Sequence, residues 1–231
     1  MCHLSGKRTI LLLLLYFVGY TFILPVILTT LTLLMNPNAT MISIPLAIAF
    51  YVAFMILSIW VAKPIWKDSL QQFSKDIFKN IVIIILGVFA ILIVNLVLGI
   101  IISLITNSSE SLNQQAIAEN AMIAPMFTLF ASIVFAPIVE ETVFRGGVFT
   151  FLRKKHSLFF AMLISSLLFG FIHVSDSLLT GQYQDLIYLL VYSGLGLVLS
   201  YSYEKSNSIV VSMGIHLGNN LIAFLVMMST M

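Results

Sequence analysis

The feature that most constrains this chain is an uncharged apolar run near its start. From Thr9 to Ala62 the sequence contains no Asp, Glu, Lys or Arg. A water-soluble core cannot cover that much unbroken apolar chain, whereas a helix that crosses a bilayer needs about 20 such residues. Of all 231 residues, 60% are apolar and 9% are charged, against about 25% charged in soluble domains. The sequence therefore predicts an integral membrane protein.

Seven apolar segments are long enough to cross the hydrocarbon core of a membrane. They are residues 9–35, 41–62, 80–106, 121–152, 157–174, 185–203 and 207–228. The turn signal Asn36-Pro37-Asn38 divides the first two, and Pro137 is expected to kink the long fourth segment or to begin a second helix there. We therefore expect an all-α, polytopic membrane helix bundle of about seven transmembrane helices. Residues 1–231 are expected to form one integral membrane domain.

The positive residues fall on alternate connections of this bundle. Ten of the eleven Lys and Arg residues lie before the first span, in residues 63–79, in residues 153–156 or at Lys205. The intervening loops, residues 36–40, 107–120 and 175–184, contain none. The positive-inside rule then predicts a cytoplasmic N-terminus and an external C-terminus. The mixed Lys and Asp stretch in residues 63–79 is typical of an amphipathic segment at the membrane interface.

Several functional classes are excluded by what the sequence lacks. A net charge of +2, with no basic polar domain, argues against a nucleic-acid partner. The single cysteine, Cys2, excludes an internal disulfide and a CxxC metal site. There is no HExxH zinc motif and no GxSxG nucleophile elbow. The four Asp residues all fall in loops or at span ends, which excludes an aspartyl dyad within the membrane.

Ionisable residues inside the spans are the candidates for function, because burying each in a bilayer costs at least about 2.5–3.5 kcal/mol. They are Glu140, Glu141 and Arg145 in the fourth span, His173 in the fifth and His216 in the seventh, joined by the amide of Asn220. At about 1.5 Å per residue, Glu140 lies about 20 Å before Arg153, His173 about 25 Å after His156, and His216 about 17 Å beyond Lys205. The three spans therefore bring these groups to a similar depth.

The spacing within each span indicates what each group does. Glu141 and Arg145 are one helical turn apart, so they can form an ion pair that lowers the cost of burying both. Glu140 projects about 100° away from Glu141 and stays free for chemistry. A carboxylate and an imidazole can hold and deprotonate a water molecule. His216 and Asn220, also one turn apart, can stabilise the oxyanion that forms when water attacks a carbonyl.

These residues carry a resemblance to a known family. The sequence contains EExxxR at Glu140, Glu141 and Arg145, FxxxH from Phe169 to His173, and HxxxN from His216 to Asn220. In this order, on three spans, they resemble the motifs of the CPBP intramembrane proteases (CAAX proteases and bacteriocin-processing enzymes, the Abi family). The resemblance covers residues 121–228, the motif-bearing core of the domain.

The resemblance implies an intramembrane endopeptidase in a bacterial plasma membrane, whose partner is a membrane-associated peptide or protein substrate. It implies that Glu140 is the catalytic base, with His173, His216 and Asn220 as the other catalytic residues. The polar site is then expected within the membrane between the last four spans, with Glu141 and Arg145 as supporting residues. Small residues at Gly146 and Gly147 are expected to permit close helix approach beside the carboxylates.

Two questions stay open at the level of the sequence. The same three side chains, Glu140, His173 and His216, fit a His₂Glu zinc site with an open fourth position, or a site that activates water without a metal. The alternatives to a protease are a non-catalytic scaffold of the same fold, for bacteriocin immunity or for binding a regulator, and a proton-coupled transporter. Transport is disfavoured because no paired broken helices occur in two matching halves of the sequence.

Overall fold

The computed structural model describes residues 2–106 and 110–230, and every regular element within them is a helix. Seven of its helical stretches are long and apolar enough to cross a membrane. These candidate spans are Gly6–Met35, Ile44–Val61, Ile77–Thr106, Pro125–Arg153, Leu158–Leu179, Tyr183–Ser206 and Ile209–Thr230. The all-α architecture and the number of spans predicted from the sequence are therefore confirmed.

The spans are built from the following elements. The first consists of α1 (Gly6–Leu14), the π-helical η1 (Leu15–Ile23) and α2 (Leu24–Met35), and the second is α3 (Ile44–Val61). The third is α5 (Ile77–Thr106). The fourth contains α7 (Pro125–Leu129), η2 (Phe130–Phe135), α8 (Ala136–Glu141), η3 (Thr142–Phe149) and α9 (Thr150–Arg153). The last three contain α10 (Leu158–Leu179), then η4 (Tyr183–Tyr188) with α11 (Leu189–Ser206), and finally α12 (Ile209–Thr230).

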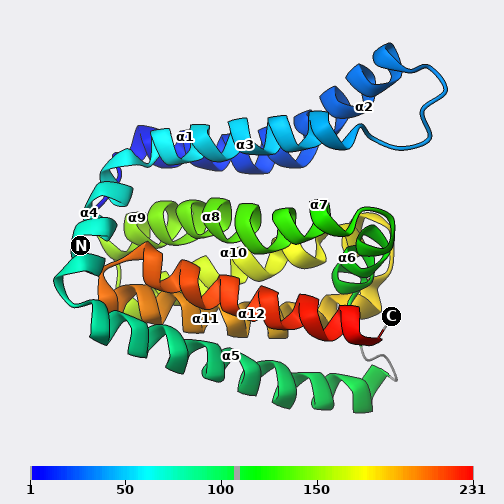
Figure 1. Cartoon of the computed structure of the whole chain (residues 1–231). Coiled ribbons are helices and arrows are strands. Elements are labelled where there is room, and N and C mark those ends of the chain that lie inside the picture. The colour runs from blue at the N-terminus through cyan, green and yellow to red at the C-terminus, as the bar shows by residue number, and fades with distance from the viewer. Residues whose placement is uncertain (1, 107–109, 231) are drawn as a thin grey trace.

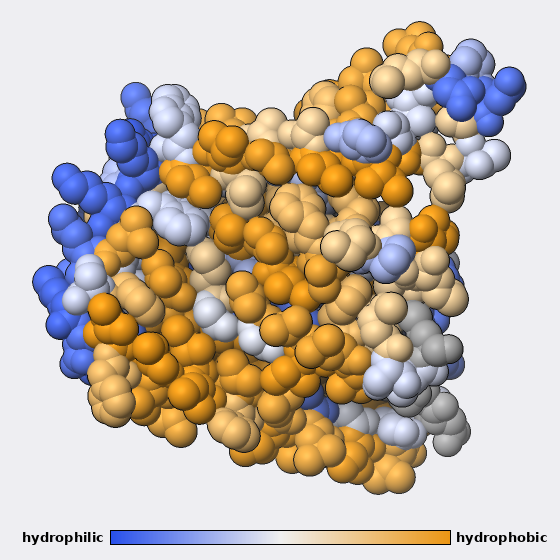
Figure 2. All heavy atoms as spheres, in the orientation of Figure 1, coloured by the Kyte–Doolittle hydropathy of each residue, from blue (hydrophilic) through white to orange (hydrophobic). Residues whose placement is uncertain are grey.

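Two short helices connect the spans at opposite ends of the bundle. Figure 1 shows α4 (Lys63–Lys75) beside the N-terminus and α6 (Leu112–Ile123) at the other end, near the C-terminus. Between these ends the spans run along the length of the bundle. In Figure 1, α1 and α3 lie above α7–α9, and α5 lies below α12. Figure 2 shows hydrophilic residues gathered at the α4 end and an apolar surface along the middle. This distribution is the one expected of a bundle surrounded by lipid.

The amphipathic segment predicted from residues 63–79 is the helix α4. It exposes Lys63 and Lys67 and buries Ile65 and Ser69. The backbone N–H of Ile209 donates to the hydroxyl of Ser69 over 3.1 Å. The hydroxyl of Ser208 donates to the carbonyl oxygen of Ser69 over 2.8 Å. The first bond satisfies one of the N–H groups that have no partner within α12, and both bonds join α4 to the start of that helix.

Pro137 interrupts the regular helix of the fourth span without ending the span. Proline has no N–H to donate to the carbonyl four residues before it, and the π-helical η2 lies directly before the helix α8 that contains Pro137 in its first turn. Pro25 stands in the same relation to η1 and α2. The first and fourth spans therefore widen locally beside Pro25 and Pro137 and continue.

The connection expected over residues 107–120 lies between two spans, as predicted, but part of it is helical. Residues 107–109 lie outside the described residues, but α6 begins at Leu112 and ends at Ile123. Its first turn is capped, because the hydroxyl of Ser111 accepts the backbone N–H of Gln114 over 3.2 Å. Residues 121–123, which the hydropathy pattern assigned to the fourth span, belong to this helix, and the span itself begins at Pro125.

The backbones of α10 and α11 approach each other closely, away from Gly146 and Gly147. A Cβ atom added at Gly196 would lie 2.8 Å from the Cα of Ser166, and one added at Gly170 would lie 2.9 Å from the backbone N of Ser193. At Gly146 and Gly147 the nearest atoms would be 3.4 and 3.7 Å away. Small residues therefore permit close packing as expected, but at the interface of the fifth and sixth spans.

Candidate active site

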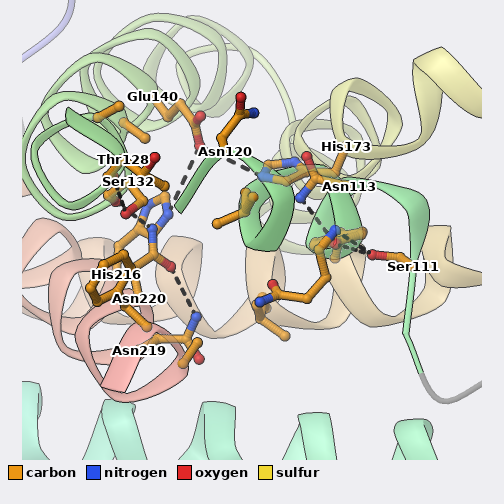
Figure 3. Close-up of a pocket in the computed structure, with 18 of the residues that line it drawn as sticks. Ser111, Asn113, Asn120, Thr128, Ser132, Glu140, His173, His216, Asn219 and Asn220 are labelled. Carbon is orange, nitrogen blue, oxygen red and sulfur yellow. Dashed lines mark hydrogen bonds and ion pairs between the residues drawn. The ribbon is translucent and has the colours of Figure 1, made fainter. Parts of the chain in front are cut away.

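Three spans bring one carboxylate and two imidazoles together (Figure 3). Oε2 of Glu140, on α8, lies 3.9 Å from Nε2 of His173, on α10, and 3.9 Å from Nε2 of His216, on α12. Glu140 is 9% exposed and His216 is 4% exposed. Oε2 of Glu140 is buried and accepts no hydrogen bond from any residue that the structure describes. The three side chains that the sequence analysis placed at a common depth are therefore neighbours.

The two histidines are oriented by hydrogen bonds through their other ring nitrogens. Nδ1 of His173 lies 2.8 Å from the carbonyl oxygen of Phe169, one turn earlier on α10. Because a carbonyl oxygen only accepts, Nδ1 of His173 carries the proton, and in the neutral ring Nε2 presents its lone pair towards Glu140. The ring of Tyr192 stacks on His173, with centroids 4.5 Å apart. Both contacts fix the plane of the His173 ring.

His216 is held in the same manner by a carboxylate. Its Nδ1 lies 3.3 Å from Oε1 of Glu141, so Nδ1 is the donor and Nε2 faces Glu140. The adjacent carboxylates Glu140 and Glu141 therefore have different neighbours. Glu140 faces both Nε2 atoms, whereas Glu141 orients His216 from behind.

Arg145 neutralises Glu141 in the interior of the bundle. Its Nη1 donates to Oε1 of Glu141 over 3.0 Å, and both side chains are fully buried. Its Nη2 donates to the carbonyl oxygen of Gly196, on α11, over 3.0 Å, and its guanidinium lies 4.6 Å from the ring centroid of Phe169, on α10. The ion pair expected from the spacing of EExxxR is thus present, and it also ties the fourth span to the fifth and sixth.

Tyr16, in the first span, was missed by the sequence analysis. Its hydroxyl donates to Oε1 of Glu140 over 3.4 Å, and the residue is 3% exposed. This contact leaves Oε2 as the free oxygen of Glu140. The signal in the sequence is faint: Tyr16 and Tyr20 are four residues apart within the uncharged run. Tyrosine is common in membrane spans, so that spacing did not single them out.

A chain of side-chain amides surrounds Asn220. Asn95, on α5, donates to Asn219 over 3.1 Å, and Asn219 donates to Asn220 over 3.1 Å. Asn220 in turn donates to the carbonyl oxygen of Ser132 over 2.8 Å (Figure 3). The hydrogen bond from Asn95 to Asn219 joins α5 to α12. Asn220 faces the same cavity as His216, with one amide N–H committed to Ser132.

A cavity of about 660 Å³ reaches these groups. Glu140, His173, His216 and Asn220 all line it. A second cavity, of about 550 Å³, lies along the first span and the fifth span, and Glu140 and His173 line it as well. The carboxylate and one imidazole therefore stand where the two cavities meet.

The three side chains fit a water molecule better than a preformed zinc site. Two ligands of a tetrahedral zinc ion lie about 3.4 Å apart, given zinc–ligand bonds of about 2.1 Å, whereas each Nε2 is 3.9 Å from Oε2. No group of three His, Cys, Asp or Glu residues in the described part of the chain has the arrangement of a metal site. A water between them could accept and donate hydrogen bonds at ordinary lengths of about 2.8 Å.

Comparison with known proteins points to one family. Residues 122–222 match the family described as Rce1-like, type II CAAX prenyl endopeptidase. The chain is 31% identical over 172 residues to YdiL of Bacillus subtilis, which carries the name of a membrane peptidase; the match covers 74% of this chain and 66% of the relative. It is 28% identical over 182 residues to the UPF0177 protein YvdC of Lactococcus lactis, covering 78% and 65% of the two chains.

A third relative is the membrane-embedded CAAX protease MroQ of Staphylococcus aureus. It is 28% identical over 142 residues, which are 58% of this chain and 53% of MroQ. The chain thus spans about two thirds of the length of the first two relatives and about half of the third. No solved structure matches the chain. The matched family range contains Glu140, His173 and His216.

Proposed function

Since this chain belongs to the Rce1-like type II CAAX prenyl endopeptidase family, we propose that it hydrolyses a peptide bond of a membrane-associated peptide or protein. The observation that carries the proposal is the approach of both Nε2 atoms to the free oxygen of Glu140, each at 3.9 Å. A cavity leads to this point. The arrangement offers a proton acceptor and two oriented imidazoles where a water and a peptide carbonyl can meet.

The proposed hydrolysis uses a water molecule that Glu140 and His173 hold and that Glu140 deprotonates. A water held by Glu140 and by Nε2 of His173 gives one proton to Glu140 as its oxygen attacks the carbonyl carbon. The C=O electron pair moves onto the oxygen. Glu140 then passes the proton to the amide nitrogen as the C–N bond breaks, leaving a carboxylic acid and an amine.

In this proposal His216 and Asn220 stabilise the oxyanion of the intermediate. His216 can donate from Nε2 only as an imidazolium, because its Nδ1 proton is directed to Glu141. Asn220 retains one amide N–H beyond the one bonded to Ser132. Donors fixed in this way act without reorganising during the reaction.

Substitution of the base and its partner tests the proposal. Glu140→Gln keeps shape and hydrogen bonding but removes the base, which typically costs about 10²–10⁴-fold in rate. We expect Glu140→Gln and His173→Ala to abolish cleavage of a membrane peptide at normal expression. Asn220→Ala should lose about 10²–10³-fold, as for one oxyanion donor. Purified protein assayed against candidate membrane peptides gives the measurement.

Matched substitutions distinguish chemistry from general damage. Glu119→Gln, on the exposed face of α6, and His156→Ala, in the exposed connection before α10, should retain activity. Cellular function that survives Glu140→Gln and His173→Ala unchanged would contradict the protease and favour a scaffold of the same fold. Treatment with a chelator belongs in the same assay. If the chelator abolishes activity and zinc alone restores it, Glu140, His173 and His216 form a metal site.

A further inference from the structure

The two ends of the bundle carry charges of opposite sign. All Lys and Arg residues except Arg145 lie at one end, which is formed by the N-terminus, α4, the start of α5, the connection over residues 153–156 and the end of α11. The opposite end, where α6 and the connection from α10 to η4 lie, carries four acidic residues: Glu110, Glu119, Asp176 and Asp185. The positive-inside rule places the Lys- and Arg-rich end in the cytoplasm.

The path to the candidate site runs from the acidic end alone. Along the fourth span the lining of the larger cavity begins at Phe127 and stops at Glu140, and along the seventh span it begins at His216 and continues to Phe224. In both spans the site residue is thus the innermost lining residue. Asn113 and Asn120 of α6, both labelled in Figure 3, line the same cavity together with Gln114.

The other side of the site is sealed by packed side chains. Every residue from Glu141 to Thr150 is buried. Phe144 and Phe149 are both fully buried there, and Phe149 stacks edge-on against Tyr203. No residue of this segment lines either of the two cavities, so both cavities reach Glu140 from the side away from the Lys- and Arg-rich end.

The smaller cavity lies in the same half of the bundle. It is lined by Leu24, Pro25 and Leu28 of the first span, in the half nearer α6, and by Ser175 and Leu179 at the end of α10. Figure 1 shows α2 diverging from the rest of the bundle on this side. A chain held in the outer leaflet could thus reach Glu140 sideways between α2 and α10.

The residues that line the larger cavity also indicate which kind of substrate can enter it. Six primary amides line the larger cavity, and among the described residues no Lys or Arg does so. These amides are Asn95, Asn113, Gln114, Asn120, Asn219 and Asn220. Side-chain amides both donate and accept, as a peptide backbone requires. A negatively charged chain end would therefore find no Lys or Arg side chain to pair with in this lining.

We propose that the site takes its substrate from the extracytoplasmic side, as a polypeptide segment that lies at the outer leaflet and enters the amide-lined cavity beside α6. This proposal rests on the proposed peptidase function for its chemistry. The side of access, however, is set by the charges, the cavity and the sealed segment. A substrate confined to the cytoplasm would not reach Glu140.

Cysteine labelling tests the side of access without requiring activity. The chain has one cysteine, Cys2, so Cys2→Ser gives a background without thiols. In that background Asn113→Cys and Asn120→Cys report on the cavity, and Ser74→Cys, exposed on α4, reports on the opposite end. A charged, membrane-impermeant thiosulfonate is applied to intact cells and to inverted membrane vesicles.

We expect the cavity cysteines to be labelled in intact cells and Ser74→Cys only in inverted vesicles. Labelling of both cavity cysteines only in inverted vesicles, or labelling of Ser74→Cys in intact cells, would overturn the proposal. Cleavage is then measured in oriented vesicles before and after external labelling. Loss of cleavage for Asn113→Cys, with the thiol-free protein unaffected, supports access through this cavity, and unchanged cleavage after complete labelling contradicts it.

The same preparations separate this proposal from the proposed function. If the detergent-solubilised Cys2→Ser protein cleaves no membrane peptide, the peptidase function fails, while the labelling pattern still decides the side of access. If that protein cleaves in detergent but the cavity cysteines react only from the cytoplasm, the function stands and the side of access is wrong.

Discussion

At the scale of single residues, the site depends on which hydrogen bonds hold the reacting groups. Glu140 and Glu141 are adjacent, yet Glu141 is occupied by Arg145 and His216, while Oε2 of Glu140 has no hydrogen-bond partner among the described residues. The difference follows from the helix, which turns neighbouring side chains by about 100°. One carboxylate therefore supports the structure and the other remains available for a reaction.

Arg145→Ala should lower the amount of folded protein. Removing one partner of a buried ion pair costs about 3–5 kcal/mol, because the remaining Glu141 carboxylate is left buried and unpaired. Arg153→Ala is the matched control, since Arg153 pairs with Glu204 at a partly exposed site, where such pairs contribute about 0–1 kcal/mol. Thermal unfolding in detergent measures both. Equal stability of Arg145→Ala and wild type would contradict the structural role of Arg145 and favour a role in binding substrate.

Tyr16→Phe should slow catalysis while the protein stays folded. The substitution removes only the hydroxyl that donates to Oε1 of Glu140, so Glu140 loses one positioning contact, and we expect kcat to fall by about tenfold, equivalent to about 1.4 kcal/mol. Tyr20→Phe is the control, because the Tyr20 hydroxyl contacts Tyr51 instead. Tyr16 is a positioning residue, so the pH profile of kcat should shift in Tyr16→Phe alone. Identical kcat and pH profiles for the two variants would remove Tyr16 from the site.

At the scale of helices, close packing of α10 on α11 sets the position of the site. The carbonyl oxygen of Gly196 accepts from Arg145, and Phe169, on the facing helix, lies against the same guanidinium. Both contacts require the two helices to be near each other, which the absence of side chains at Gly170 and Gly196 allows. The π-helical η3, which follows Glu141 directly, contains Arg145 and is buried throughout.

Gly196→Ala should destabilise the protein by about 1–3 kcal/mol, the usual cost of forcing extra atoms into a packed interface. The new Cβ would lie 2.8 Å from the Cα and Cβ of Ser166, which cannot move without shifting α10. Gly99→Ala is the control, because nothing lies within 4 Å of a Cβ there. Thermal unfolding compares the two, and a Gly196→Ala protein as stable as Gly99→Ala would show that the helices separate at little cost.

The helices were predicted more completely than the site, for a physical reason. A membrane span can be predicted from its own residues, since it must be apolar over its whole length. The residues of EExxxR and of HxxxN are likewise positioned by the geometry of a single helix. The contact of Tyr16 with Glu140 joins residues 124 positions apart, and no pattern near Tyr16 in the sequence predicts it. The helix α6 was missed because it is polar enough to read as a loop, although Ser111 caps it.

At the scale of the whole molecule, the bundle has two unlike ends joined by an apolar middle. Figure 2 shows the hydrophilic residues of the α4 end next to this apolar surface. Lys and Arg occur at that end and at Arg145, and the rest of the chain has none. The orientation in the membrane therefore depends on a charge asymmetry that the sequence carries along its full length.

Reporter fusions should find the two ends on opposite sides of the membrane. A reporter inserted at Ser74, on α4, should be active in the cytoplasm, and one inserted at Gly181, in the turn between α10 and η4, should be active outside. Paired reporters that are each active on one side only give the measurement. Activity of both insertions on the same side would contradict the topology between the third and fifth spans.

The sealed segment after Glu140 also has an electrical consequence. If cavity water carries the outer potential as far as Glu140, the membrane voltage drops almost wholly across the dry stretch between Glu140 and Arg153, about 20 Å of helix. A unit charge crossing that stretch would exchange about 2.3 kcal/mol per 100 mV with the field. Protons that reach and leave Glu140 through the cavity never cross it. The chemistry at Glu140 should therefore proceed at the same rate in energised and de-energised membranes, and the bundle should not leak protons.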